Sequence, residues 1–258
     1  MAGAIVYARA GAVANVTLVN PGKHNAIDIA MWGELRALFE RLQAIQPLDA
    51  PRVIVVKGDG GQFASGGDIA EFATFRFDPQ RLHDFHEHVV APALCAMLDC
   101  DIPLIAKIDG ACIGGGLEIA ACCDIRLGGA SSRYGAPIAK LGFPMAPSEL
   151  AILARVVPVA LLRSVLLEAQ LLGADAALRA GILHAAVDDA ALGPLASERA
   201  ERIATLSPQA ARLNKRSFRQ LARGGPDADE LHAHFAYADS TDHREGIAAF
   251  LDKRTPRF

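Results

Sequence analysis

Polar and apolar residues alternate at the start of the chain and give way further along to short runs that are mostly apolar. Residues 4–20 hold two alternating runs on either side of Ala10-Gly11, which predicts an opening β-hairpin. Residues 52–57 and 103–108 are mostly apolar, as is typical of strands buried on both faces. Two more short runs predict strands, at 124–128 and 184–187.

Between these runs the apolar positions recur at helical spacing. Asp28 can cap a helix that runs to about Ile45. Further helices are expected at 69–75, 82–97, 117–123, 147–167 and 174–181. From Asp189 onward we expect only helices, interrupted near Ser207-Pro208 and Gly224-Gly225-Pro226. Strands that alternate with helices and lead into a helical tail predict an α/β fold with an α-helical C-terminal appendage.

Composition narrows the class of protein. The chain has 258 residues, of which 52% are hydrophobic and 21% charged, so it can bury a sizeable core. A net charge of −3 without a basic stripe argues against nucleic acid as a partner. The first residues lack the features of a signal peptide, and no apolar run is long enough to cross a membrane. With five cysteines in no paired spacing, we expect reduced thiols and a cytoplasmic protein.

The stretch Ile108 to Ala121 carries the first candidate chemistry. A buried strand leads through Gly114-Gly115-Gly116 into an apolar, Ala-rich helix. The first turn of a helix has unpaired N–H groups and the positive end of the helix dipole, which suit an oxygen that gains negative charge. Glu118 follows three residues after Gly115, so its carboxylate should project near the same helix start. The alternative is that the glycines only permit tight packing and Glu118 only complements the dipole.

A second junction of the same type occurs at residues 58–68, where glycines again connect a buried strand to a helix. Two such junctions can place two backbone N–H groups around one oxygen. Neither fits a phosphate-binding loop: no Lys-Ser or Lys-Thr pair follows, and the glycines do not match G-x-G-x-x-G. Ser65 is not in a G-x-S-x-G context, so a serine nucleophile is disfavoured.

Histidines and acids also cluster along one predicted helix. His83, His86 and His88 lie beside Asp84 and Glu87. Residues three apart on a helix can share a metal ion, but no partnering pair is visible elsewhere in the sequence. We therefore interpret the cluster as a solvated helix face and expect no metal site.

Four motifs together resemble the enoyl-CoA hydratase/isomerase family, also called the crotonase family. Asn20-Pro21-Gly22-Lys23-His24-Asn25-Ala26 is similar to its N-R-P-x-x-x-N-A loop. Phe63-Ala-Ser-Gly-Gly-Asp-Ile69 is similar to F-x-A-G-x-D-[LI], and the stretch 109–124 to x-G-x-x-x-G-G-G-x-E-L-A-x-x-C-D. The ending from Glu245 to Phe258 is similar to E-G-x-x-A-F-x-E-K-R-x-P-x-F. The resemblance covers nearly the whole chain.

The resemblance implies a spiral of β-β-α turns over residues 1–188 and an α-helical region for trimerisation over 189–258. It implies an acyl-CoA substrate, no cofactor beyond the coenzyme A that the substrate carries, and a homotrimer or dimer of trimers. The oxyanion-hole amides fall on Gly67 and Gly115, and the first catalytic glutamate falls on Glu118. CoA or substrate contacts fall on Lys23, His24, Ala26, Ala64, Gly66, Asp68, Ile69, Gly114, Ile138, Phe250 and Lys253. The last two usually serve the ligand of a neighbouring subunit.

One departure from the family pattern bears on the reaction. Hydratases of the family carry a second glutamate in a G-x-P-E motif, and here the matching run is Gly135-Ala136-Pro137-Ile138. An isoleucine cannot transfer a proton, so two-glutamate hydration is in doubt. Glu149, eleven residues further on, is a candidate second acid. The alternatives are isomerisation, decarboxylation or retro-Claisen chemistry with one carboxylate, and an acyl-CoA-binding protein without catalysis.

Overall fold

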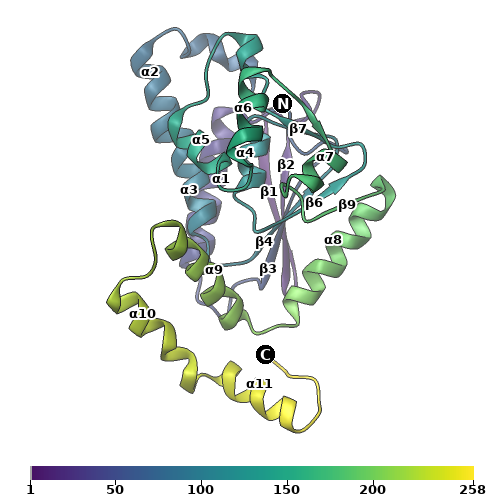
Figure 1. The fold of residues 1–258 in the computed structure, drawn as a ribbon, viewed down its shortest axis with the longest axis vertical. Helices are drawn as coiled ribbons and strands as arrows, with labels where there is room; N and C mark the ends of the chain where they lie inside the picture. The colour runs from purple at the N-terminus through teal and green to yellow at the C-terminus, as the bar shows by residue number, and fades with distance from the viewer. Residues whose placement is uncertain (1) are drawn as a thin grey trace.

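The computed structural model describes residues 2–258, and its centre is a six-stranded sheet (Figure 1). The strands follow the order β1-β2-β3-β4-β6-β9, in which only β1 and β2 pair in antiparallel fashion. Their bounds are β1 Ala4–Ala10, β2 Val13–Val19, β3 Val53–Gly58, β4 Leu104–Ile108, β6 Ile125–Gly129 and β9 Ala185–Val187. The predicted hairpin and the four later strands are confirmed.

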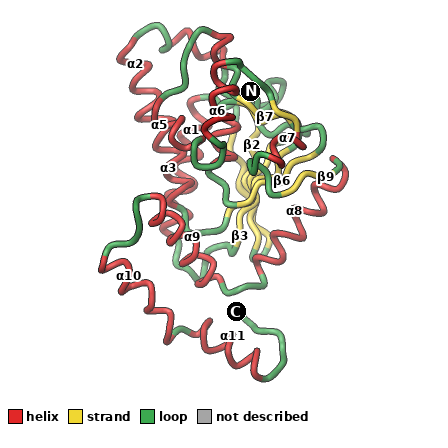
Figure 2. The backbone as a smooth tube through the Cα atoms, viewed as in Figure 1, coloured by secondary structure: helices red, strands yellow, loops and turns green. Residues whose placement is uncertain are grey.

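The run at 52–57 has apolar residues at consecutive positions because it forms β3, which is buried on both faces. Val53 and Val55 belong to a small apolar cluster beneath α8 (Asp189–Ala204). Ile54 and Val56 point the other way, into the main core, which also receives α1 (Ile29–Ala44) and α3 (Ala91–Asp99). Because successive side chains of a strand point to opposite faces, both faces of β3 are buried. Helices thus cover the sheet on both sides (Figure 2).

A second, three-stranded sheet was not predicted from the sequence. It joins β5 (Ala111–Ile113), β7 (Arg133–Gly135) and β8 (Leu172–Gly173) in the order β5-β7-β8. Each strand is two or three residues long, too short to show a periodic pattern. β5 lies inside the first glycine-rich stretch, directly before α4 (Gly115–Ala121), so this small sheet holds the start of α4 in place.

The remaining helices match the predicted segments with local differences. Asp28 caps α1 by accepting a hydrogen bond of 2.8 Å from the Met31 N–H. The segment after Asp68 is the 3₁₀-helix η1 (Ile69–Thr74). The predicted helix over 82–97 is three pieces: α2 (Pro79–Asp84), the π-helix η2 (Phe85–Val90) and α3. Four more elements follow: η3 (Ile138–Leu141), α5 (Pro147–Leu153), α6 (Val159–Leu167) and α7 (Ala174–Arg179).

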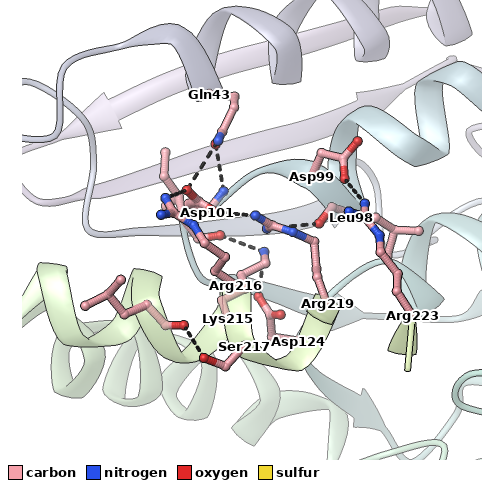
Figure 3. Close-up of polar contacts among 12 residues, drawn as sticks. Gln43, Leu98, Asp99, Asp101, Asp124, Lys215, Arg216, Ser217, Arg219 and Arg223 are labelled. Carbon is pink, nitrogen blue, oxygen red and sulfur yellow. Dashed lines mark hydrogen bonds and ion pairs between the residues drawn. The ribbon is translucent and has the colours of Figure 1, made fainter. Parts of the chain in front are cut away.

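The chain ends in helices, as predicted: after α8 come α9 (Pro208–Ala222), α10 (Ala228–His234), η4 (Phe235–Asp239) and α11 (Thr241–Leu251). Helix α9 docks on the core through ion pairs, because Arg216 and Arg219 both bind the buried Asp101 (Figure 3). Lys215 donates to the Ile102 carbonyl at 2.8 Å. Beyond α9, α10, η4 and α11 extend away from the sheet as an arm (Figure 1), and the last residue returns to the core, where the Phe258 carbonyl accepts a hydrogen bond from Arg52.

Candidate active site

The two glycine-rich junctions lie against each other. Ala64 donates its N–H to the Ala111 carbonyl at 2.8 Å, and its own carbonyl accepts the Ile113 N–H at 3.0 Å. A Cβ on Gly116 would lie 2.6 Å from that same Ala64 carbonyl oxygen, so only glycine lets α4 begin this close to the second junction. Backbone pairing thus joins the segments whose proximity the sequence suggested.

Each junction presents a backbone N–H that has no hydrogen-bond partner among residues 2–258. Gly67 is flanked by Gly66, whose carbonyl accepts from Ile27, and by Asp68, whose N–H donates to Ile27. Gly115 is the first residue of α4, where helical N–H groups lack a partner within the helix. Both glycines line the same cleft. Two backbone N–H groups without partners, facing one cleft, can both donate to a single substrate oxygen, as an oxyanion hole requires.

The cleft has a volume of about 300 Å³ and a largely apolar wall. Its lining residues come from segments that are distant in the sequence: α1, both glycine junctions, η1, η2, η3 and the start of α5. Aromatic and aliphatic side chains form most of the wall: Trp32, Ile69, Phe72, Phe85, Val90, Ile113, Ile138, Leu141, Phe143 and Met145. A cavity of this kind, with a few polar groups at fixed places, is typical of a small-molecule site.

Two carboxylates enter this cleft. Glu118 comes from the first turn of α4 and Glu149 from the first turn of α5, and these helices pack together. Their side chains are almost fully buried, with exposed fractions of 4% and 5% for the residues. Burial raises the pKa of Glu118 well above its ordinary value, and the charge of Glu149 raises it further. The sequence-based candidates for acid and second acid therefore share one buried site.

The π-helix η2 fixes the position of Glu149. His86 Nδ1 lies 2.5 Å from Glu149 Oε1, and the hydroxyl of Ser148 donates to both carboxylate oxygens of Glu87 at 3.0 Å. The interpretation of His86 and Glu87 as part of a solvated face is therefore wrong. A π-turn advances more residues per turn than an α-helix, so it turns these side chains toward α5.

The rest of that cluster is exposed as predicted. His83, Asp84 and His88 point to solvent, and their potential ligand atoms lie within 4.8 Å of one another. They do not line the cleft.

Known proteins decide the family. The sequence profile of the enoyl-CoA hydratase/isomerase family matches residues 8–258. The chain belongs to the enoyl-CoA hydratase/isomerase family. The (E)-benzylidenesuccinyl-CoA hydratase of Thauera aromatica is 30% identical, with 95% of each chain covered. The 2,3-dehydroadipyl-CoA hydratase of Escherichia coli (strain K12) is also 30% identical, over 98% of each chain.

Solved structures of the family share the fold. A crystal structure described as an enoyl-CoA hydratase/carnithine racemase from Magnetospirillum magneticum superposes with a TM-score of 0.93 at 38% identity, covering 98% of this chain and 94% of that one. A putative enoyl-CoA hydratase/isomerase family protein from Hyphomonas neptunium gives a TM-score of 0.90 at 31% identity, with 98% and 97% covered. The predicted crotonase fold is thereby confirmed.

The family's predicted CoA loop contacts the second glycine junction and, among residues 2–258, is not part of the cleft lining. Lys23 forms an ion pair of 2.5 Å with Asp68, and this hydrogen bond raises the pKa of Lys23. Asp68 also caps η1 by accepting from the Ala70 N–H. His24, whose carbonyl accepts the Ser65 N–H, has a positive φ of 49°. These contacts join the loop to the second glycine junction. Ala26 and Ala64 are buried beside it.

The other predicted contacts divide into two groups. Gly66, Ile69, Gly114 and Ile138 line the cleft. Phe250 and Lys253 instead lie at the end of α11 on the arm and do not line the cleft of their own chain. Phe250 is 81% exposed. Their predicted role at a neighbouring subunit's ligand stays a prediction.

Several cleft residues were missed by sequence reasoning. Trp32, the only tryptophan, packs against Gly115, where a Cβ would lie 2.9 Å from its Cζ2. Its place in the helical stripe of α1 suggested only a core residue. Arg76 and Phe143 come from loops without a periodic pattern. A positive charge next to three phenylalanines at 72, 75 and 77 was the one available signal for Arg76.

Among the helices of residues 2–258, none has the length and apolar character needed to cross a membrane.

Proposed function

We propose that this protein catalyses the reversible addition of water to the double bond of an enoyl-CoA thioester. The observation that supports this most directly is the pair of buried carboxylates, Glu118 and Glu149, in a cleft that also presents the N–H groups of Gly67 and Gly115. Hydration needs one group to activate water and another to protonate carbon. The chain supplies two such groups although Ile138 occupies the family's usual second position.

In the proposed reaction, the thioester carbonyl oxygen accepts hydrogen bonds from Gly67 and Gly115. As the enolate forms, negative charge collects on that oxygen, where each donor contributes about 3 kcal/mol to transition-state stabilisation. Trp32 and Glu118 line the same cleft, so the reacting carbons of a bound thioester lie within reach of the Glu118 carboxylate. A Cβ on Gly115 would lie 3.9 Å from Glu118 Oε2, so the carboxylate stands beside the donor.

Proton transfer is divided between the two glutamates. Glu149, hydrogen-bonded to His86, takes a proton from the water whose oxygen bonds to C3. Glu118, with its raised pKa, enters the step protonated and gives its proton to C2. Two adjacent buried carboxyl groups favour the state in which one is protonated and the other ionised. After the hydrated product forms, a proton passes from Glu149 to Glu118 and restores the starting state of the enzyme. The reverse reaction follows the same steps backwards and releases water.

The substrate class follows from the family and its relatives. Several relatives are named as hydratases of CoA thioesters. Lys23 and the loop to Ala26 are proposed to contact the CoA portion. Coenzyme A itself supplies the only non-protein group in this mechanism. No metal or redox step is needed, because every proton has a named donor or acceptor.

Isomerisation of an enoyl-CoA double bond is the second candidate. Ile138 in the cleft wall favours isomerisation. Of the family's two usual glutamate positions, only the first, Glu118, carries a carboxylate here. In that case Glu118 alone would move a proton between two carbons. Decarboxylation, retro-Claisen cleavage and acyl-CoA binding without turnover are the remaining outcomes of the test.

We also propose that the protein assembles into trimers or paired trimers in the cytoplasm. Exposed apolar side chains on α9, α10, η4 and α11 support an interface: Phe218, Leu221, Leu231, Phe235, Ile247, Phe250 and Leu251. All five cysteines are free thiols, as is typical of a reducing compartment.

The test is a substrate panel of enoyl-, β-keto- and malonyl-type CoA thioesters with the wild type, Glu118→Gln and Glu149→Gln. Hydration requires that the wild type consume an enoyl-CoA and form the 3-hydroxyacyl-CoA, and that both variants lose this activity. Isomerisation that survives Glu149→Gln would favour the second candidate. If no thioester reacts and acyl-CoA still binds, the protein is a binding protein.

A further inference from the structure

Among residues 2–258, Arg76 is the one arginine that lines the cleft, and the proposed hydration does not use it. It lies in the segment between η1 and α2, and its guanidinium carbon is 4.0 Å from the centre of the Phe72 ring and 3.7 Å from that of the Phe143 ring. Contacts of this kind hold a cation in a fixed place and offset part of the cost of removing it from water. The charge is therefore held at the cavity wall.

One donor of this guanidinium lacks an acceptor. Its Nε is buried and has no hydrogen-bond partner among residues 2–258. Burial lowers the pKa of Arg76, and Glu149 is the carboxylate whose charge opposes this effect. Glu149 is itself hydrogen-bonded to His86. A buried donor without an acceptor costs free energy, and a ligand that brings an acceptor recovers it.

The walls around Arg76 indicate which part of a ligand would reach it. Phe72, Phe85 and Phe143 give this part of the cleft an apolar surface, which suits an acyl chain rather than the polar body of CoA. A chain that passes over these rings and ends in a carboxylate would meet the planar donor edge of a guanidinium, a pairing that is often bidentate.

We propose that Arg76 binds a carboxylate at the far end of the acyl chain, so that the cleft selects CoA thioesters of dicarboxylic acids over those of unbranched monocarboxylic acids. This inference rests on the proposed binding of an acyl-CoA in the cleft. It adds a specificity residue and does not change the proposed hydration step.

Binding of saturated thioesters tests the inference without turnover, because they have no double bond to hydrate. We would measure dissociation constants by calorimetry for succinyl- and butyryl-CoA, glutaryl- and pentanoyl-CoA, and adipyl- and hexanoyl-CoA. For at least one pair, the wild type should bind the dicarboxylic member about tenfold or more tightly. Arg76→Met, which keeps an apolar stem between the rings, should remove this preference and weaken the dicarboxylic member about 30-fold. Arg76→Lys should retain part of it.

Controls separate the charge at Arg76 from other effects. Lys140→Met removes an exposed positive charge from the same cleft and should leave the ratio of each pair unchanged. Circular dichroism and thermal unfolding establish that each variant is folded. If Arg76→Met weakens both members of a pair and free CoA equally, the anion that Arg76 binds is a CoA phosphate and the proposal is wrong. Equal affinities for both members of every pair in the wild type would also overturn it.

These outcomes are distinct from failure of the proposed function. A dicarboxylic preference without any hydration of enoyl-CoA would keep the binding inference and refute the reaction. Hydration of enoyl-CoA without a preference that depends on Arg76 would do the reverse.

Discussion

The imidazole of His86 lies 2.5 Å from the carboxylate of Glu149, at the point where the π-helix η2 meets the first turn of α5. Both side chains are largely buried, and both line the cleft. A carboxylate held by an imidazole has one oxygen fixed and the other directed elsewhere, which is the geometry that a general base requires. His86 is thus a positioning residue for Glu149 in the proposed hydration.

Replacing His86 tests this relationship. His86→Phe removes the hydrogen bond and should lower kcat for hydration about 10-fold or more, because Glu149 loses its fixed orientation. KM should change less than kcat. His86→Gln can restore a hydrogen bond and should recover part of kcat. His83→Gln, on the exposed side of α2, is the matched control and should behave as wild type. If His86→Phe raises KM and leaves kcat unchanged, the positioning role is wrong.

Replacing Glu149 tests whether it is the second carboxylate of the reaction, the base that activates water. Glu149→Gln keeps the size of the side chain but cannot accept the proton of water, so hydration should fall by about 100-fold or more. The double variant Glu149→Gln/Ile138→Glu places a carboxylate at the family's usual position in the same cleft wall and should regain part of the rate. Wild-type hydration rates in Glu149→Gln would show that another group activates the water.

Replacing Glu118 separates chemistry from binding. Glu118→Gln should reduce turnover of every reactive thioester by about 100-fold or more, since the amide cannot transfer the proton to carbon. The dissociation constant for a saturated acyl-CoA should change by less than about threefold, because the cleft walls and the glycine N–H groups stay in place. Single-turnover kinetics and calorimetry measure the two effects. Unchanged turnover would refute the enolate mechanism.

The raised pKa of Glu118 also predicts how stability depends on pH. Burial places this pKa above the ordinary value of 4.5, so the folded protein holds a proton that the unfolded chain has released. The stability that Glu118 contributes is fully present below the unfolded pKa and is lost as pH rises through the folded pKa. Glu118→Gln lacks this titration. Its unfolding free energy should therefore rise relative to the wild type as the pH increases above the ordinary value of 4.5.

Urea unfolding at a series of pH values measures that difference. Glu201→Gln, on the exposed face of α8, serves as the control and should give a difference that does not vary with pH. A constant difference between wild type and Glu118→Gln across the same range would mean that Glu118 is already ionised in the folded protein. Glu118 would then not be the proton donor to C2.

The sequence predicts those parts of the site that local patterns encode. The glycines at 66, 67 and 114–116 and the acid at 118 follow directly from strand-glycine-helix order. The partnership of Glu149 with His86 does not, because it depends on a π-turn that changes which face of the helix meets α5. Periodicity assumes 3.6 residues per turn, and a single π-turn breaks that count. Arg76 was missed for a related reason: Phe143, from a distant loop, completes its surroundings.

The arm formed by α10, η4 and α11 predicts the assembly state. Its apolar side chains, Phe235, Ile247 and Phe250 among them, are exposed in the single chain, and burying them requires a partner surface. A trimer should therefore have a mass of three times 27.2 kDa by light scattering at micromolar concentration, or six times for paired trimers. Phe250→Asp should shift the mass toward one chain, since a charge in an apolar interface is costly.

Leu48→Asp provides the control, because Leu48 is an exposed apolar residue in the loop after α1, far along the chain from the arm. It should leave the mass unchanged. A trimer bound to an acyl-CoA should also bring Phe250 and Lys253 beside the CoA of a neighbouring subunit, so Lys253→Met should weaken acyl-CoA binding while the protein stays assembled. A wild-type mass of one chain would contradict the predicted assembly, and with it the role of the arm in completing a neighbour's site.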